Sequence, residues 1–385
     1  MFIECIERMK SMRKKLDIRR VVEWLDEKQV ADLAAAPLYA LDPFNTHFKE
    51  IEPAQYYEAR RKRRVRPPRR SLLVMTWNIK FAGGRIDFWF DGHGDRVILR
   101  DWEVIAHLEG LAAKINQVDP DILLLQEVDV DSKRVAHIDQ MQWLLDRTRL
   151  NYGAYASQWR SDLVPTRGLG KVDMGIAVMS KFPIGDAQRL ALPQMKTQDR
   201  LTRYFYLKRA VLSAKVNLPG GADIHVVNTH TEAFSTGETK RQQIALFKSE
   251  LDRIDAAGGV FVGGGDLNSL PPGTSQLHGF ADVVRTGADD YDASDYRGEE
   301  DCLEALYDSY RPAVELELYQ SDSAPHFTHS TSGSHFWSRK LDYLFTNVIF
   351  EEGSAMTHQD SERGGMATMK LSDHAPVSAR LVLQQ

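Results

Sequence analysis

One stretch of the sequence, Gly263-Gly-Gly-Asp-Leu-Asn-Ser-Leu-Pro271, has residue types that can bind a phosphate and move its proton. Asp266 and Asn268 lie two residues apart, so in an extended backbone both side chains leave the same face. A carboxylate can take up a proton, and an amide can donate a hydrogen bond to a phosphate oxygen. The same residue types are also ordinary in turns. The rest of the chain must therefore decide between a phosphate site and a turn.

Apolar, β-branched runs predict the strands that would position these residues. They cover residues 72–77, 121–125, 175–179, 209–216, 222–227, 259–262, 341–345 and 376–382. Apolar residues at helical spacing predict helices over residues 101–117, 139–150 and 240–254. This alternation of helices and strands indicates an α/β protein.

Polar residues stand within or just after these predicted strands. They are Asn78, Glu127, His230, Asp266, Asn268, Asp342, Asp373 and His374. Taken singly, each has an ordinary explanation, such as a helix cap, a half-buried histidine or a turn. In α/β folds, however, polar groups at strand ends converge into a crevice where ligands bind. Eight such positions in one chain favour a shared site.

Six short motifs around these residues follow one another in a definite order. They are Thr76-Trp-Asn78, Leu125-Gln-Glu127, Asn228-Thr-His230, Gly264-Gly-Asp-Leu-Asn268, Lys340-Leu-Asp342-Tyr and Ser372-Asp-His374-Ala-Pro376. With them the chain, from about residue 71 to 383, resembles the endonuclease/exonuclease/phosphatase superfamily. That superfamily includes DNase I-like nucleases, neutral sphingomyelinases, inositol-polyphosphate phosphatases and deadenylases. The resemblance implies a four-layer α/β sandwich of two mixed β-sheets flanked by helices.

The resemblance also implies hydrolysis of phosphoester bonds with Mg²⁺ or Mn²⁺. Hard divalent cations prefer oxygen ligands, and Mg²⁺ typically takes one or two carboxylates together with waters and substrate phosphate. Glu127 would be the principal metal ligand, with Asn78 beside it. Asp373 would be a further oxygen donor, directly or through water.

The resemblance assigns the remaining motif residues to catalysis. Asp342 would fix the tautomer of His374 and leave its other nitrogen for water or phosphate. His230 and Asn268 would bind non-bridging phosphate oxygens. Asp266 would orient or deprotonate the attacking water, or protonate the leaving oxygen. How proton transfer is divided between Asp266 and His374 stays open.

Two residues beside the motifs have weaker predictions. Glu232 either orients His230 or lies in solvent, and solvent is the favoured expectation. Arg339 either contacts phosphate or lies at the surface.

The chain before these motifs has a different character. Residues 1–58 are predicted to form a small helical N-terminal extension. Residues 59–70 carry eight cations, Arg60-Arg-Lys-Arg-Arg64, Arg66, Arg69 and Arg70, in a chain whose net charge is −5. Such a run can bind nucleic acid or an anionic membrane. The adjacent Pro67-Pro68 favours a solvated basic linker instead. The catalytic domain is then expected over residues 71–385.

The composition is that of a globular protein, with 43% hydrophobic and 27% charged residues among 385. No apolar run is long enough to cross a bilayer, and the first residues lack a signal-peptide pattern. Cys5 and Cys302 are too few for a disulfide framework or a zinc site, which fits a reducing cytoplasm. The sequence leaves the oligomeric state open.

Substrate choice is expected to depend on the loops at residues 81–100, 158–172 and 270–338. Their aromatic residues can stack on bases, contact lipid or pack on each other. They are Phe88, Trp89, Phe90, Trp159, Phe336 and Trp337. The leading hypothesis is a phosphodiesterase or nuclease acting on nucleic acid or nucleotides. The alternatives are a phosphomonoesterase or lipid/inositol phosphate hydrolase and, less favoured, a non-catalytic binding scaffold.

Overall fold

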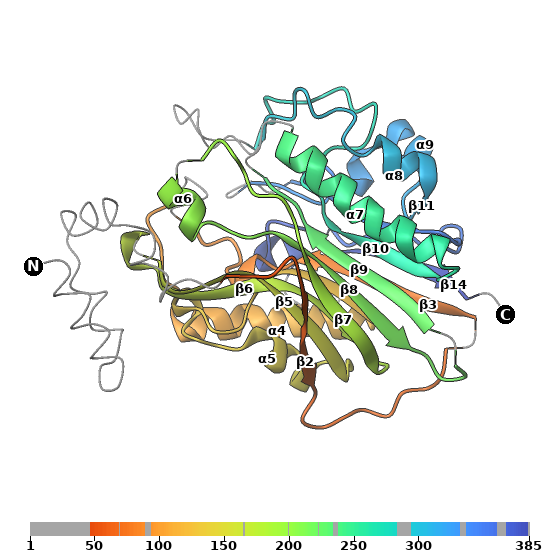
Figure 1. Cartoon of the computed structure of the whole chain (residues 1–385), viewed down its shortest axis with the longest axis horizontal. Coiled ribbons are helices and arrows are strands. Elements are labelled where there is room, and N and C mark those ends of the chain that lie inside the picture. Colours follow the sequence, from red (N-terminus) through yellow and green to blue (C-terminus); the bar gives the residue numbers. More distant parts are fainter. Residues whose placement is uncertain are drawn as a thin grey trace, which may run out of the picture.

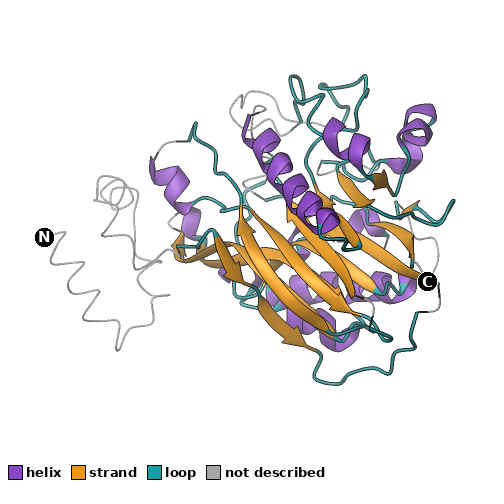
Figure 2. Cartoon of the chain, turned by 45° about the vertical axis from the view of Figure 1, so that its right-hand side comes forward, coloured by secondary structure: helices purple, strands orange, loops and turns teal. Residues whose placement is uncertain are grey.

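Two seven-stranded β-sheets lie face to face between two layers of helices (Figures 1 and 2). This arrangement confirms the expected four-layer α/β sandwich of mixed sheets. The computed structural model describes residues 47–383 except 69, 89–93, 165, 199, 222, 234–237, 283–293, 332–335 and 360–366.

The first sheet has the strand order β1-β7-β8-β9-β10-β12-β11. Its strands are β1 (Ile51–Pro53), β7 (Ile184–Ala191), β8 (Ala210–Asn217), β9 (Asp223–His230), β10 (Phe261–Asp266), β12 (Asp342–Thr346) and β11 (Arg311–Pro312). Strands β9 and β10 pair in parallel, whereas the other neighbours pair antiparallel.

The second sheet has the strand order β13-β14-β3-β4-β6-β5-β2. Its strands are β13 (Met356–Thr357), β14 (Val377–Val382), β3 (Ser71–Asn78), β4 (Ile122–Asp129), β6 (Gly170–Ser180), β5 (Tyr152–Val164) and β2 (Gln55–Glu58). Strands β3 and β4 pair in parallel, and the remaining neighbours pair antiparallel.

Helices cover the outer face of each sheet. Helices α4 (Asp101–Val118) and α5 (Gln140–Arg147) pack on the second sheet, while α7 (Glu238–Ala256) and α8 (Glu304–Ser309) pack on the first. Three shorter helices lie in connections: α6 (Arg200–Phe205), α9 (Leu316–Ser321) and α10 (Thr368–Leu371). Among the described residues, no helix is both long and apolar enough to cross a membrane.

The core between the sheets is apolar and comes from alternate residues of facing strands. Val74 and Leu124 of the second sheet lie in the same buried cluster as Leu212, Val226 and Val262 of the first. Because side chains alternate across a strand, their neighbours point outward onto the helices. Burial on both faces explains why these strands appear in the sequence as nearly continuous apolar runs.

Each sheet has one β-α-β unit with a parallel pair of strands, β3-α4-β4 in one and β9-α7-β10 in the other. Strand β10 packs against both β3 and β4, so the two parallel pairs face each other across the core. Polar residues at the carboxyl ends of all four strands are thereby brought to one edge of the sandwich. This is the type of crevice in which α/β folds bind ligands.

Buried amides join the sheets just below this edge. Gln126 Nε2 donates to Asn228 Oδ1 at 2.8 Å and to Thr76 Oγ1 at 3.1 Å. Asn228 Nδ2 in turn donates to the backbone oxygens of Leu125 and Ala177, both at 2.8 Å. These bonds fix the position of one sheet relative to the other where the apolar core ends.

The helical prediction is wrong for residues 51–58, which form strands β1 and β2. Strand β1 pairs with β7 at the edge of the first sheet, and β2 pairs with β5 at the edge of the second. Proline restricts the residue before it to extended backbone and is tolerated in edge strands, which explains Pro53 in β1. Residues 1–46, the rest of the predicted extension, lie outside the described residues.

The basic segment that follows has no regular secondary structure in its described residues. Its backbone is attached to the domain, because Arg60 N donates to Asp146 Oδ1 and Arg63 N donates to Asn151 Oδ1. The side chains of residues 60–64 are exposed.

The substitution Asn228→Ala tests the buried amides. It removes one of the two acceptors of Gln126 Nε2 and the donor to two strand carbonyls, so we expect the free energy of unfolding to fall by about 1–3 kcal/mol. The exposed Asn217→Ala on β8 is the control and should change it by less than about 0.5 kcal/mol. Equal losses in urea unfolding would contradict a special role for Asn228.

Candidate active site

The register of three neighbouring strands places three predicted catalytic residues in one row. Asp266 on β10 pairs with His230 on β9 and with Asp342 on β12. Paired residues on adjacent strands lie about 5 Å apart. All three side chains are buried. The row therefore combines two carboxyl groups and an imidazole at the edge where the strands end.

The Oδ2 atom of Asp266 is the point around which the other side chains gather. It accepts a hydrogen bond from Asn78 Nδ2 at 3.0 Å. It also lies 3.4 Å from His230 Nε2 and 3.5 Å from His374 Nε2. One carboxylate oxygen thus contacts side chains from strands of both sheets and from the loop before β14.

His374 is held firmly in this arrangement. Its Nδ1 lies 2.8 Å from Asp342 Oδ2, and its backbone oxygen accepts a hydrogen bond from Trp77 Nε1 at 2.8 Å. Burial lowers the pKa of His374, but the carboxylates of Asp342 and Asp266 outweigh it and raise the pKa above its usual value. Burial, with the charge of Asp342, raises the pKa of Asp266. The two carboxylates therefore favour the protonated form of the His374 imidazole.

His230 and Asn268 line the same site. Burial lowers the pKa of His230 well below its usual value, and the charge of Arg209 adds to this effect. His230 Nδ1 has no hydrogen-bond partner among the described residues. Asn268 has a left-handed backbone, with φ of 44°; its N–H donates to Asp266 Oδ1 at 3.0 Å and its Nδ2 to Thr231 O at 3.1 Å. The left-handed turn brings the Asn268 amide back against Asp266.

Glu127 enters the site through a distortion of β4. The pairing of β4 with β6 shifts register between Leu125 and Val128, and Glu127 has a left-handed backbone with φ of 55°. Such bulges re-aim a side chain next to active sites. Glu127 Oε1 accepts a hydrogen bond from Asn78 Nδ2 at 3.0 Å. The Asn78 amide thus bridges the carboxylates of Glu127 and Asp266.

The carboxylates on this side fit a divalent cation. Burial and the charge of Asp373 raise the pKa of Glu127, as expected for two acidic groups close together. A cation between them would relieve this repulsion, and carboxylate oxygen is the ligand type that Mg²⁺ prefers. Asp373 is partly neutralised by Lys80, whose Nζ lies 3.3 Å from Asp373 Oδ2. Asn78 presents its amide nitrogen to Glu127, because its Oδ1 accepts from Lys80 N at 3.0 Å.

A second group, Asp266, Asp342 and His374, brings one possible ligand atom from each residue within 4.8 Å of the others. Asp342 and His374 are already joined by a hydrogen bond between Oδ2 and Nδ1. An imidazole nitrogen is also a poorer ligand for Mg²⁺ than oxygen. The arrangement of this second group suits proton transfer better than it suits a metal ion.

Comparison with known families agrees with the geometry of this site. Residues 75–374 match the model of the Endonuclease/Exonuclease/phosphatase family. The chain belongs to this family. Its match extends from the strand that carries Asn78 to His374 and so contains all eight predicted site residues.

Several solved structures are similar to this family member. An endonuclease/exonuclease/phosphatase from Beutenbergia cavernae is 21% identical, with a TM-score of 0.54 over 82% of this chain and 72% of the other. A family protein from Leptotrichia buccalis is 14% identical, with a TM-score of 0.50 over 81% and 100%. The human Nocturnin catalytic domain with bound sulfate is 17% identical, with a TM-score of 0.49 over 86% and 98%. Comparison with curated proteins gives no match.

Two residues of the site have no signal in the sequence. His329 Nδ1 lies 3.1 Å from His374 Nε2, and their rings are 4.5 Å apart. Lys80, which pairs with Asp373, lies in a short turn after Asn78 with a left-handed backbone. Neither residue belongs to an apolar strand run, so only the folded chain brings them to the family's motif residues.

The structure corrects the predictions for Glu232 and Arg339. Glu232 is buried rather than solvated, and it accepts a hydrogen bond from Tyr206 Oη at 2.7 Å. Arg339 is also buried, and its Nη1 donates to Asp282 Oδ1 at 3.0 Å. Arg339 therefore does not lie at the surface, and its Nη1 is already bonded to Asp282 instead of being available to a phosphate.

Most of the predicted loop aromatics that the structure describes pack inward. Phe88 is fully buried, and the indole N–H groups of Trp159 and Trp337 each donate to a backbone carbonyl. Phe336 is 47% exposed, and residues 89–93 lie outside the described residues. Of the described loop aromatics, Phe336 is therefore the one that reaches the surface most.

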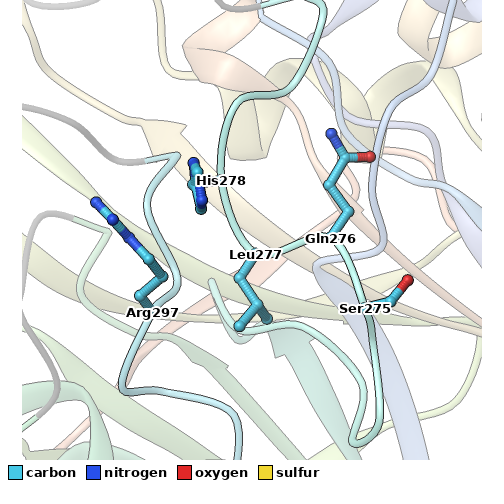
Figure 3. Close-up of a pocket in the computed structure, with 5 residues that line it drawn as sticks. All are labelled: Ser275, Gln276, Leu277, His278 and Arg297. Atoms are coloured by element: carbon cyan, nitrogen blue, oxygen red, sulfur yellow. The ribbon is translucent and has the colours of Figure 1, made fainter.

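A surface hollow of about 450 Å³ lies elsewhere, in the segment after β10 (Figure 3). Its lining residues are Ser275, Gln276, Leu277, His278 and Arg297. None of the eight predicted residues lines this hollow, so it is not the family's catalytic site.

Gly264→Ala tests whether the row depends on close strand contact. A Cβ atom there would lie 1.9 Å from Tyr343 O and would force β10 away from β12. We expect the free energy of unfolding to fall by at least about 2 kcal/mol. In Gly185→Ala the added atom would meet the Asn217 side chain at 3.2 Å, so this control should cost less. Equal thermal stability of the two variants would contradict the packing argument.

Proposed function

We propose that the chain is a divalent-metal-dependent phosphodiesterase, using Mg²⁺ or Mn²⁺, that acts on nucleic acid or nucleotides. The observation that carries this proposal is the environment of Asp266 Oδ2. Asn78 Nδ2, His230 Nε2 and His374 Nε2 all lie within 3.5 Å of it. The same Asn78 amide hydrogen-bonds to Glu127. A proton acceptor, phosphate-binding groups and a metal ligand thus surround one point.

In this proposal the chain's own residues divide the work as follows. Asp266 orients and deprotonates the attacking water, since its Oδ2 lies within 3.5 Å of Asn78, His230 and His374. His374, held by Asp342, stabilises negative charge on the phosphate. His230 and Asn268 donate to non-bridging oxygens. Glu127 and Asp373, supported by Asn78, would hold the cation, which would supply charge stabilisation for the leaving oxygen of an in-line displacement.

Two surface features support a nucleic acid or nucleotide substrate. Phe336 is 47% exposed, and aromatic side chains are the residues on which single-stranded bases stack. The exposed cations at residues 60–64 add positive charge to a chain whose net charge is negative. Lipid and inositol phosphates remain the competing substrates in the test below.

Metal binding can be tested without an activity assay. Millimolar Mg²⁺ or Mn²⁺ should raise the midpoint of thermal unfolding of the wild type, because a ligand that binds the folded state stabilises it. Glu127→Gln removes the charge of the principal ligand and should abolish most of that rise. The exposed Asp308→Asn on α8 is the control and should keep the full rise. An equal rise in all three proteins would exclude Glu127 as the ligand.

Asp266→Asn should lower kcat by about 100-fold or more, because it removes the proposed proton acceptor and keeps the shape of the side chain. Wild type and variant are assayed on single- and double-stranded DNA, RNA, inositol phosphates and sphingomyelin, with Mg²⁺, Mn²⁺ or EDTA. Activity that survives EDTA, or full activity of the variant, would refute the mechanism. Turnover of inositol phosphates or sphingomyelin alone would refute only the preference for nucleic acid.

A further inference from the structure

Arg209, immediately before β8, extends the catalytic row by one strand. In the sheet order, β8 lies next to β9 on the side away from β10. Val211 of β8 pairs with Thr229 of β9, which places Arg209 beside the end of β9 that carries His230. Burial lowers the pKa of His230, and the positive charge of Arg209 lowers it further. The guanidinium therefore affects the imidazole at this end of the row.

The guanidinium of Arg209 is buried but poorly satisfied. The residue is 5% exposed, and its Nε and Nη1 have no hydrogen-bond partner among the described residues. The nearest acidic group is Glu232, whose Oε2 lies 3.8 Å from Nε, which is too far for a hydrogen bond. Glu232 Oε1 instead accepts from Tyr206. A buried cation with unused donors is costly unless another group completes its bonds.

Two other buried arginines of this fold have such groups. Arg134 donates through Nε and Nη2 to Asp129. Arg189 donates through Nε to Ser157 O and through Nη2 to Lys208 O. These guanidinium groups serve packing, because protein acceptors satisfy their donors. Arg209 differs from them in leaving two donors without an acceptor beside a catalytic residue.

We propose that Arg209 binds a second phosphate of the substrate, next to the one that is cleaved. This inference rests on the proposed function and names the substrate class more closely, a polynucleotide chain or a nucleotide with a neighbouring phosphate. The guanidinium fork matches two phosphate oxygens. The scissile phosphate already has His230, Asn268 and His374 as partners, and Arg209 lies one strand farther along the row.

Two substrates separate the roles. Bis(p-nitrophenyl) phosphate is a diester without a neighbouring phosphate, whereas a single-stranded oligonucleotide has one. For Arg209→Met we expect kcat/KM on the oligonucleotide to fall at least tenfold more than on bis(p-nitrophenyl) phosphate, mainly through KM. Loss of one phosphate contact should also reduce the slope of log KM against log salt concentration by about 0.7.

Two further variants keep the test decisive. Arg189→Met removes a guanidinium that is buried but satisfied, so it should lower the unfolding temperature and leave the oligonucleotide salt slope intact. Arg209→Lys keeps the positive charge but lacks the planar guanidinium. We expect it to restore the salt slope and to lose less kcat/KM than Arg209→Met, with the loss confined to the oligonucleotide. The same measurement tests the proposal if Arg209→Met does not fold.

An equal loss of kcat/KM on both substrates, or an unchanged salt slope in Arg209→Met, would overturn the role of Arg209. If wild type hydrolyses neither substrate, the proposed function itself is wrong.

Discussion

The hydrogen bond from Asn78 Nδ2 to Asp266 Oδ2 joins the two sheets at the point where the chemistry is proposed. Each partner ends a strand of the parallel pair in its own sheet, so the bond forms only when both β-α-β units are in register. The buried bond between Gln126 and Asn228 holds the same register one layer deeper. The arrangement of the site residues therefore depends on how the two sheets are aligned, and less on the conformation of any single loop.

Much of this site could be predicted because its residues follow apolar strands that are visible in the sequence. Asn78, His230 and Asp266 end strands, and their convergence follows from the general behaviour of α/β sheets. Lys80 and His329 could not be found in this way, since a left-handed turn and a long connection bring them to the site. The same holds for Arg209, whose Nε and Nη1 lack a hydrogen-bond partner among the described residues.

Errors of prediction arose where tertiary pairing overrides local preference. Residues 51–58 form strands because two sheet edges are available to them, although those edges are about 95 to 140 residues away in the sequence. The burial of Glu232 likewise depends on Arg209 and Tyr206, which come from a different strand connection. Local patterns contain no information about partners at such distances.

The edge strands β1 and β2 also have a consequence for how the chain is made. Residues 51–58 leave the ribosome before the strands with which they pair, β5 and β7, have been synthesised. Until those strands are made, the backbone N–H and C=O groups of β1 and β2 lack their sheet partners, and both segments lie next to the cationic residues 60–64 in the sequence. Positive charge next to an unpaired edge discourages association between nascent chains. The cations at residues 60–64 follow β2 directly, which is where charge of this kind disfavours such association.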